Sequence, residues 1–135
     1  MAYWLLKSDP ETYGFPDLER DKQTVWDGVR NNLALRYLKE MKKSDLVLIY
    51  HSGKDKQIEG IAEITRAAYA DPKRSDPKLV VVDLKIRQRL ARPVTLAQIK
   101  ADPDFSQFSL VRMSRLSVMP VPEELWKKLL KMDGR

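Results

Sequence analysis

Residues 46–69, LVLIYHSGKDKQIEGIAEITRAAY, decide the fold of this 135-residue chain. Residues 46–52 form an apolar run of strand length, and residues 58–69 predict a second strand with a bulge at Gly60. The stretch Ser52-Gly53-Lys54-Asp55 lies between them and is typical of a turn. We therefore expect these two strands to pair as a hairpin.

Other strands and short helices surround this hairpin in the sequence. Residues 3–7 predict a strand that ends at Ser8-Asp9-Pro10, because proline donates no ladder hydrogen bond. In residues 79–90 charged and apolar side chains alternate, which predicts a long strand with one buried and one basic face. A further strand is expected at residues 116–119. Helices are expected at residues 15–19, from Asn32 onward, at 96–99 and from Pro122 onward. Asn31 or Asn32 would be the N-cap of the second of these helices, and Thr95 the N-cap of the third.

This irregular mixture of strands and short helices predicts an α+β fold. The hairpins indicate a strongly curved, barrel-like sheet that is antiparallel or mixed. The length and the 43% hydrophobic content fit a single domain over residues 1–135.

Composition excludes several classes of protein. The chain has no cysteine, so disulfides, thiolate nucleophiles and thiolate-bound zinc are ruled out. No apolar run approaches the roughly eighteen residues that span a bilayer, and residues 1–7 do not resemble a secretory signal. We expect a cytoplasmic protein without a membrane partner.

The positive charge is distributed unevenly. The net charge is +6, and residues 1–70 contain eleven Lys and Arg against eleven Asp and Glu. Residues 71–135 contain fourteen against eight, so the whole excess lies in the second half. An asymmetric basic surface suggests a polyanion such as nucleic acid as partner. A solvated basic surface explains the charge equally well.

The stretch Trp26-Asp27-Gly28-Val29-Arg30-Asn31 combines a flat aromatic ring, a small-residue turn, a cation and a primary amide. Together with Tyr50-His51-Ser52-Gly53, these residue types suit a pocket for a flat, hydrogen-bonding ring on an anionic backbone, such as a nucleobase. Two alternatives remain open: Trp26 as an ordinary core residue, and Asn31 as a helix N-cap.

Motifs for common cofactors and metals are absent. There is no G-x-G-x-x-G, no G-x-x-x-x-G-K-[ST] and no H-E-x-x-H, and His51 is the only histidine. Asp9, Glu11 and Asp17 are spaced like ordinary loop acids. A triad of Ser8 or Ser52 with His51 and an aspartate lacks the context of a nucleophile elbow. We expect neither a metal nor a cofactor.

Six stretches, taken together and in order, resemble the signature blocks of the EVE domain family. They are Trp4-Leu5-Leu6-Lys7-Ser8-Asp9-Pro10, Trp26-Asp27-Gly28-Val29-Arg30-Asn31, Tyr50-His51-Ser52, Gly60-Ile61-Ala62-Glu63, Val82-Asp83-Leu84 and Arg115-Leu116-Ser117-Val118-Met119-Pro120. The resemblance implies a PUA-like pseudo-barrel related to the YTH and ASCH domains. It also implies that the domain reads a modified base in DNA or RNA rather than converting it.

The resemblance further implies one base-binding pocket, formed by Ser8, Trp26, Asn31, Tyr50, His51 and Ser52. Trp26 would stack on the flipped base or contact its edge, and Ser8 and Asn31 would form hydrogen bonds with its polar edge. Tyr50 would form an aromatic wall against a methyl-type substituent. The flanking phosphates would be held by Lys7, Arg30 and Lys54. The basic face of residues 79–90 adds Arg87 and Arg89 as expected phosphate contacts.

The chain departs from the family pattern at two places. The family commonly continues after Arg30-Asn31 with a Tyr-Gln-Ala-Arg-Asn type run, where this chain has Asn32-Leu33-Ala34-Leu35-Arg36. Leucines at a pocket rim would change the choice of ligand or remove base binding. Leu79 stands where many members carry a tryptophan, which removes one aromatic wall.

Three functional interpretations follow. The leading one is a non-catalytic module that reads a modified or flipped-out base. The second is an enzyme acting on a nucleotide or nucleic acid, with His51 as general base and Asp27 or Asp9 as its orienting group. The third treats Trp26, Tyr50 and His51 as core residues and the basic strand as a protein-docking face. The sequence leaves open the modification, the choice between DNA and RNA, and the oligomeric state.

Overall fold

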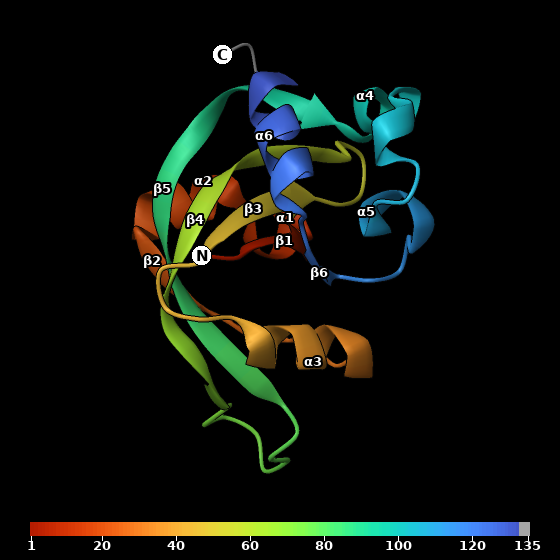
Figure 1. Cartoon of the computed structure of the whole chain (residues 1–135). Coiled ribbons are helices and arrows are strands. Elements are labelled where there is room, and N and C mark those ends of the chain that lie inside the picture. The colour runs from red at the N-terminus through yellow and green to blue at the C-terminus, as the bar shows by residue number, and fades with distance from the viewer. Residues whose placement is uncertain (133–135) are drawn as a thin grey trace.

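Apolar strands form the centre of the molecule. The computed structural model describes residues 1–132, and within them six strands form one sheet in the order β2-β5-β4-β3-β1-β6 (Figure 1). The strands are β1 Tyr3–Ser8, β2 Gln23–Trp26, β3 Leu46–His51, β4 Gln57–Ala70, β5 Val80–Thr95 and β6 Val118–Pro120. β1 and β3 run parallel, and all other neighbours are antiparallel. The predicted hairpin is confirmed as the β3–β4 pair.

Short helices surround the sheet. They are α1 Pro10–Tyr13, α2 Phe15–Asp21, α3 Asn32–Glu40, α4 Leu96–Ala101, the 3-10 helix η1 Pro103–Phe105, α5 Ser109–Arg112 and α6 Glu123–Met132. The Asn31 Oδ1 accepts the Ala34 N–H at 3.0 Å, so Asn31 is the N-cap of α3. Thr95 caps α4 as predicted. None of the helices in residues 1–132 combines the length and apolar character needed to cross a bilayer.

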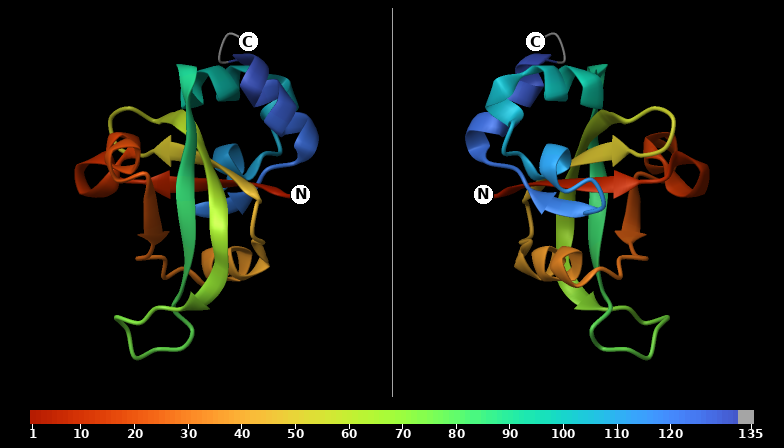
Figure 2. Two further views of the ribbon diagram at one scale, coloured as in Figure 1. Left: turned by 90° about the vertical axis from the view of Figure 1, so that its left-hand side faces the viewer. Right: turned by 90° about the vertical axis from the view of Figure 1, so that its right-hand side faces the viewer.

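The sheet curves strongly without closing. β4 and β5 are 14 and 16 residues long, and both bend as they cross the molecule (Figure 2). Their pairing shifts register at four places, including the predicted bulge at Gly60. Within the described chain β2 and β6 are the two outer strands. The α+β class and the strongly curved mixed sheet are therefore confirmed.

Phe15 docks the first two helices onto the sheet. Its ring is fully buried against Gly60, where an added Cβ would stand 2.1 Å from the Phe15 Cζ. The Phe15 N–H donates to the His51 Nε2 at 2.8 Å, and the Arg89 guanidinium carbon lies 5.1 Å from the ring centroid. The missing side chain of Gly60 thus leaves room for the Phe15 ring.

Several element boundaries differ from the sequence expectation. β5 continues beyond residue 90 through Pro93, which lies in the irregular stretch opposite Glu59, where a proline is tolerated. The strand expected at 116–119 is Val118–Pro120. β2 was not expected, because its four residues carry no apolar alternation and depend on the edge of β5 for pairing. α1, η1 and α5 are too short to give a periodic signal.

Gly60→Ala is expected to lower the free energy of unfolding by about 1 to 3 kcal/mol, because the new methyl group overlaps the buried Phe15 ring. Urea denaturation of the single and double variants measures the effect. In the Phe15→Ala background the same change is expected to cost nothing further, since the overlapping ring is gone. Equal costs in both backgrounds would show that the two residues do not interact.

Candidate nucleic-acid interface

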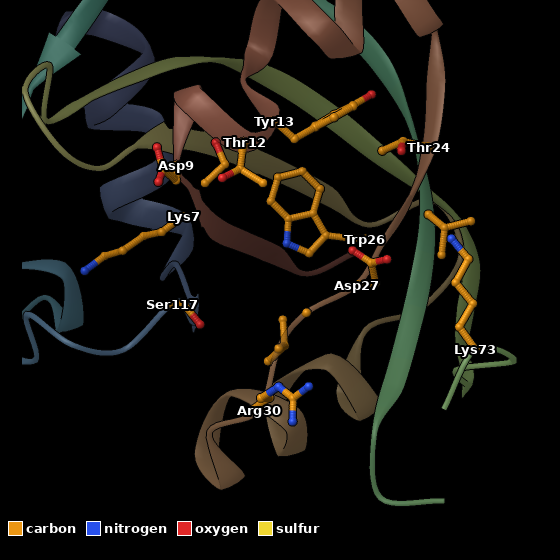
Figure 3. Close-up of a pocket in the computed structure, with 14 residues that line it drawn as sticks. Lys7, Asp9, Thr12, Tyr13, Thr24, Trp26, Asp27, Arg30, Lys73 and Ser117 are labelled. Carbon is orange, nitrogen blue, oxygen red and sulfur yellow. The ribbon is translucent and has the colours of Figure 1, made fainter. Parts of the chain in front are cut away.

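The end of β1, helix α1 and the segment that follows β2 enclose an open pocket of about 690 Å³ (Figure 3). This volume is within the usual range for small-molecule and nucleobase sites. We call it the Trp26 pocket. Its lining comes from residues 7–9, 12–13 and 24–30, with Lys73 and Ser117 from distant parts of the chain.

Trp26 forms the central wall of this pocket. It is the last residue of β2, and only 8% of its surface is exposed. The Tyr13 ring meets the indole edge-on, with centroids 6.4 Å apart and planes at 87°. Gly28 follows with φ of 78°, a left-handed conformation that turns the chain toward Val29 and Arg30. Trp26 therefore packs partly into the core and still presents indole surface to the pocket.

Ser8 places an unpartnered hydroxyl at the pocket wall. Its Oγ is the only buried side-chain polar atom in residues 1–132 that has no hydrogen-bond partner. The Ser8 carbonyl, in contrast, accepts the Ser52 N–H at 2.9 Å and the Ser52 Oγ at 3.1 Å. Because a buried hydroxyl without a partner is unfavourable, a ligand group that forms a hydrogen bond with it would strengthen binding.

Three cations surround the opening. The Lys7 Nζ donates to the Ser114 carbonyl at 2.8 Å, and burial lowers the pKa of this ammonium below the usual lysine value. Arg30 and Lys73 are exposed and form no ion pair with any residue of the described chain. In Figure 3, Lys7 and Lys73 lie on opposite sides of the Trp26 ring, with Arg30 below it. A chain of phosphates crossing the pocket would meet a positive charge on each side.

Two carboxylates also line the pocket. The Asp9 Oδ1 accepts the Glu11 N–H at 3.0 Å, which caps α1, and Asp27 is exposed. Neither forms an ion pair within the described part of the chain. No group of three or more His, Asp or Glu side chains in residues 1–132 is placed to hold a metal ion.

Four of the six residues expected to bind the base do not line the Trp26 pocket. The Asn31 Oδ1 caps α3, which is the N-cap alternative considered from the sequence. Tyr50 is 3% exposed, and its ring lies in the core beneath the Lys7 Nζ at 5.8 Å. Ser52 bonds to the main chain of Ser8 and so supports the pocket from behind.

His51 is the fourth of these residues. It is buried, and its Nε2 accepts the Phe15 N–H, so the ring proton lies on Nδ1, 3.9 Å from the Asp55 Oδ2. No ion pair or hydrogen bond joins His51 to Asp9 or Asp27 in the described structure. The general-base geometry considered from the sequence is therefore not formed, and His51 holds the start of α2 instead.

Three expected phosphate contacts lie outside the pocket. Lys54 is exposed in the β3–β4 turn. The Arg87 Nη1 pairs with the Glu63 Oε1 at 3.0 Å. The Arg89 Nε donates to the Glu19 Oε2 at 3.1 Å, and its Nη1 lies 3.2 Å from the Glu59 Oε1. The Arg89 guanidinium also lowers the pKa of the Glu19 carboxyl. The face of β5 is basic as predicted, but acidic neighbours neutralise these two arginines.

The leucines at which the chain departs from the family pattern do not form the pocket rim. Leu35 is buried, and Leu33 and Leu79 are half-buried against the core. Leu33 and Leu35 lie on α3 and Leu79 ends the β4–β5 loop, and all three pack against or within the core instead of lining the Trp26 pocket.

Six residues that line the pocket are not identified as pocket residues from the sequence: Thr12, Tyr13, Thr24, Val25, Lys73 and Ser117. Thr12 and Tyr13 follow the Lys7-Ser8-Asp9-Pro10 stretch, so a helical turn after Pro10 was the one available signal. Lys73 lies at the pocket because the β4–β5 hairpin brings it there in the tertiary structure. The sequence around Lys73 gives no signal of this contact.

Comparison with known proteins relates the chain to one family. The NMR structure of Rpa0253 from Rhodopseudomonas palustris is 43% identical and has a TM-score of 0.94 over 99% of this chain and 94% of that one. Mouse thymocyte nuclear protein 1 is 30% identical over 165 residues, which cover 97% of this chain and 73% of the relative. Human THYN1, crystallised in complex with 5-methylcytosine containing DNA, is 27% identical, with a TM-score of 0.91 over 100% of this chain and 99% of that one. The model of the EVE domain matches residues 2–132, and this chain belongs to the EVE domain family.

Proposed function

We propose that this chain is a non-catalytic module that binds DNA and takes a modified, flipped-out base into the Trp26 pocket. One observation carries the proposal: an aromatic wall, an unpartnered buried hydroxyl and three cations meet around a single opening. The human relative solved with 5-methylcytosine containing DNA supports DNA as the partner and 5-methylcytosine as the first probe.

Each part of the pocket has a separate task in this proposal. The indole of Trp26 and the ring of Tyr13 give the base an aromatic surface, since stacking contributes to binding of any base. Ser8, Thr12 and Thr24 offer hydroxyls, which both donate and accept hydrogen bonds along a base edge. Lys7, Arg30 and Lys73 contact the phosphates, which set the position of the strand but carry no base information.

The titratable groups favour binding over catalysis. The one histidine is buried and accepts the Phe15 N–H, so it does not face the base. Lys7 donates to the Ser114 carbonyl, and the Asp9 carboxylate caps α1. A base reader needs only shape, stacking and hydrogen bonds, all of which this pocket offers.

Trp26→Ala is expected to weaken binding of a 5-methylcytosine oligonucleotide about 5- to 100-fold, because stacking on an aromatic side chain contributes roughly 1 to 3 kcal/mol per base. Fluorescence anisotropy at fixed salt measures the affinity. The panel includes unmodified DNA and the matching RNA. Mass analysis of the recovered oligonucleotide tests for turnover, and none is expected.

Trp126→Ala is the matched control. Trp126 is also buried, at 4% exposure, but it stacks on Tyr3 at 4.4 Å and lies outside the Trp26 pocket. Both variants are expected to lose thermal stability, and only Trp26→Ala to lose affinity in the folded protein. Equal affinities for the two variants, or a converted base in the wild-type reaction, would contradict the proposal.

Ser8→Ala separates a binding role from a structural one. Removing a buried hydroxyl that has no partner is expected to leave the melting temperature unchanged or raised. Affinity for the modified oligonucleotide is expected to fall about 2- to 12-fold, which corresponds to one hydrogen bond of roughly 0.5 to 1.5 kcal/mol. Calorimetric melting and anisotropy on the same sample provide both values. A lower melting temperature with unchanged affinity would assign the hydroxyl to the fold alone.

A further inference from the structure

The loop that joins β4 to β5, residues 71–79, projects from the molecule at the end away from α4 and α6 (Figures 1 and 2). We call it the hairpin tip. At its base the Arg66 guanidinium stacks on the Tyr69 ring at 3.7 Å, and the Tyr69 hydroxyl donates to the Asp83 carboxylate. The tip therefore extends from a pair of strands that side-chain contacts fix in place.

The tip contains the same three-residue turn twice, as Asp71-Pro72-Lys73 and Asp76-Pro77-Lys78. In each copy the aspartate Oδ1 accepts the main-chain N–H of the lysine at 2.9 Å. The Asp71 N–H also donates to the Leu79 carbonyl at 3.0 Å, which closes the loop. The prolines fix their own backbone angles, so both lysines are held on turns that are already formed.

The acidic and basic side chains of the tip differ in their contacts. Both carboxylates accept main-chain hydrogen bonds, and Asp71 is buried. Lys73, Arg74 and Lys78 are exposed, and their side chains form no ion pair with any residue in 1–132. This is the opposite of Arg87 and Arg89 on β5, which acidic side chains already neutralise. The tip therefore presents three exposed cations that no acidic side chain of residues 1–132 pairs with.

The tip begins at the edge of the Trp26 pocket. Lys73 lines that pocket on the side opposite Lys7 (Figure 3). Arg74 and Lys78 follow Lys73 in the same loop. A strand that places one nucleotide in the pocket must continue on both sides of it. On the side of Lys73 the surface next to the pocket is the tip.

We infer that the hairpin tip is a second DNA contact, in which Lys73, Arg74 and Lys78 bind the phosphates of the strand next to the flipped base. This inference rests on the proposed function and adds an interaction surface to it. Because phosphate contacts carry no base information, the tip supplies affinity and the Trp26 pocket supplies discrimination. The alternative is that the tip binds an acidic protein, in which case the tip variant is expected to keep the DNA affinity and the salt slope of the wild type.

The test compares two triple variants with the same loss of charge. The tip variant is Lys73→Gln, Arg74→Gln and Lys78→Gln, which leaves every main-chain hydrogen bond of the two turns in place. The control is Lys100→Gln, Lys127→Gln and Lys131→Gln, on exposed positions of α4 and α6 at the far end of the molecule. Anisotropy with paired oligonucleotides, with and without 5-methylcytosine, is measured between about 50 and 200 mM salt.

The tip variant is expected to reduce the slope of log K against log salt by up to about 2.7, or about 0.9 for each phosphate that is no longer neutralised. At about 0.1 M salt this corresponds to an affinity loss of up to about 500-fold. The ratio of affinities for modified and unmodified DNA is expected to stay constant. The control is expected to keep the wild-type slope, because its charges lie on α4 and α6, at the end of the molecule away from the tip, and are not expected to neutralise phosphates.

Equal slopes for the tip variant and the control, with wild-type affinity in both, would overturn the tip contact and leave the pocket proposal intact. A falling affinity ratio in the tip variant would also overturn it, since phosphate contacts do not discriminate bases. If wild-type protein binds modified and unmodified DNA equally while the slope of the tip variant is still reduced, the pocket proposal fails and the tip contact stands. Absence of any DNA binding by the wild type would overturn both.

Discussion

The packing of Phe15 on Gly60 is the contact on which the functional surface depends. Only Gly14 separates α1 from α2, so fixing Phe15 also fixes Thr12 and Tyr13 on α1. Those two residues form one wall of the Trp26 pocket, and the Tyr13 ring sets the edge contact with the indole. The space left by Gly60 therefore helps to fix the position of the pocket wall, because it is filled by the buried Phe15 ring.

Two polar residues complete this docking. The His51 Nε2 accepts the Phe15 N–H, which would otherwise be a buried donor without a partner. Arg89 lies over the ring and pairs with Glu19 on α2 and Glu59 on β4. Both residues bind part of the protein itself, and neither lines the Trp26 pocket.

The sequence allowed part of this arrangement to be predicted. The hairpin at 46–69, the cap at Asn31 and the turn at Gly28 are local features, and all three are present. Of the expected ligand contacts, Lys7, Ser8, Trp26 and Arg30 do line one pocket. For His51 and Arg89 the predicted and observed contacts differ, because a side chain that can bind a base or a phosphate can equally bind a main-chain amide or a carboxylate. Only the tertiary contact separates these roles.

Lys73 shows the converse case, a pocket residue that the sequence analysis does not identify. The cations of the following strand alternate with apolar residues, and this pattern predicts a basic face. The sequence of the loop predicts only a turn. In the structure the alternating strand is paired with acids, and the loop carries exposed cations to the pocket edge. Charge counted along a chain does not reveal which cations are already neutralised, because the neutralising residues lie far away in sequence.

The central claim is that the base contacts Trp26. The chain has three tryptophans, and each gives its own indole N–H signal in a nitrogen-15 correlation spectrum. The Trp4 Nε1 donates to the Asp45 Oδ2 at 3.0 Å, and Trp126 stacks on Tyr3, so both serve as internal references away from the pocket. Titration with a 5-methylcytosine oligonucleotide is expected to move the Trp26 signal to saturation and leave the other two in place. A Trp26 signal that stays fixed while the oligonucleotide binds would contradict the account.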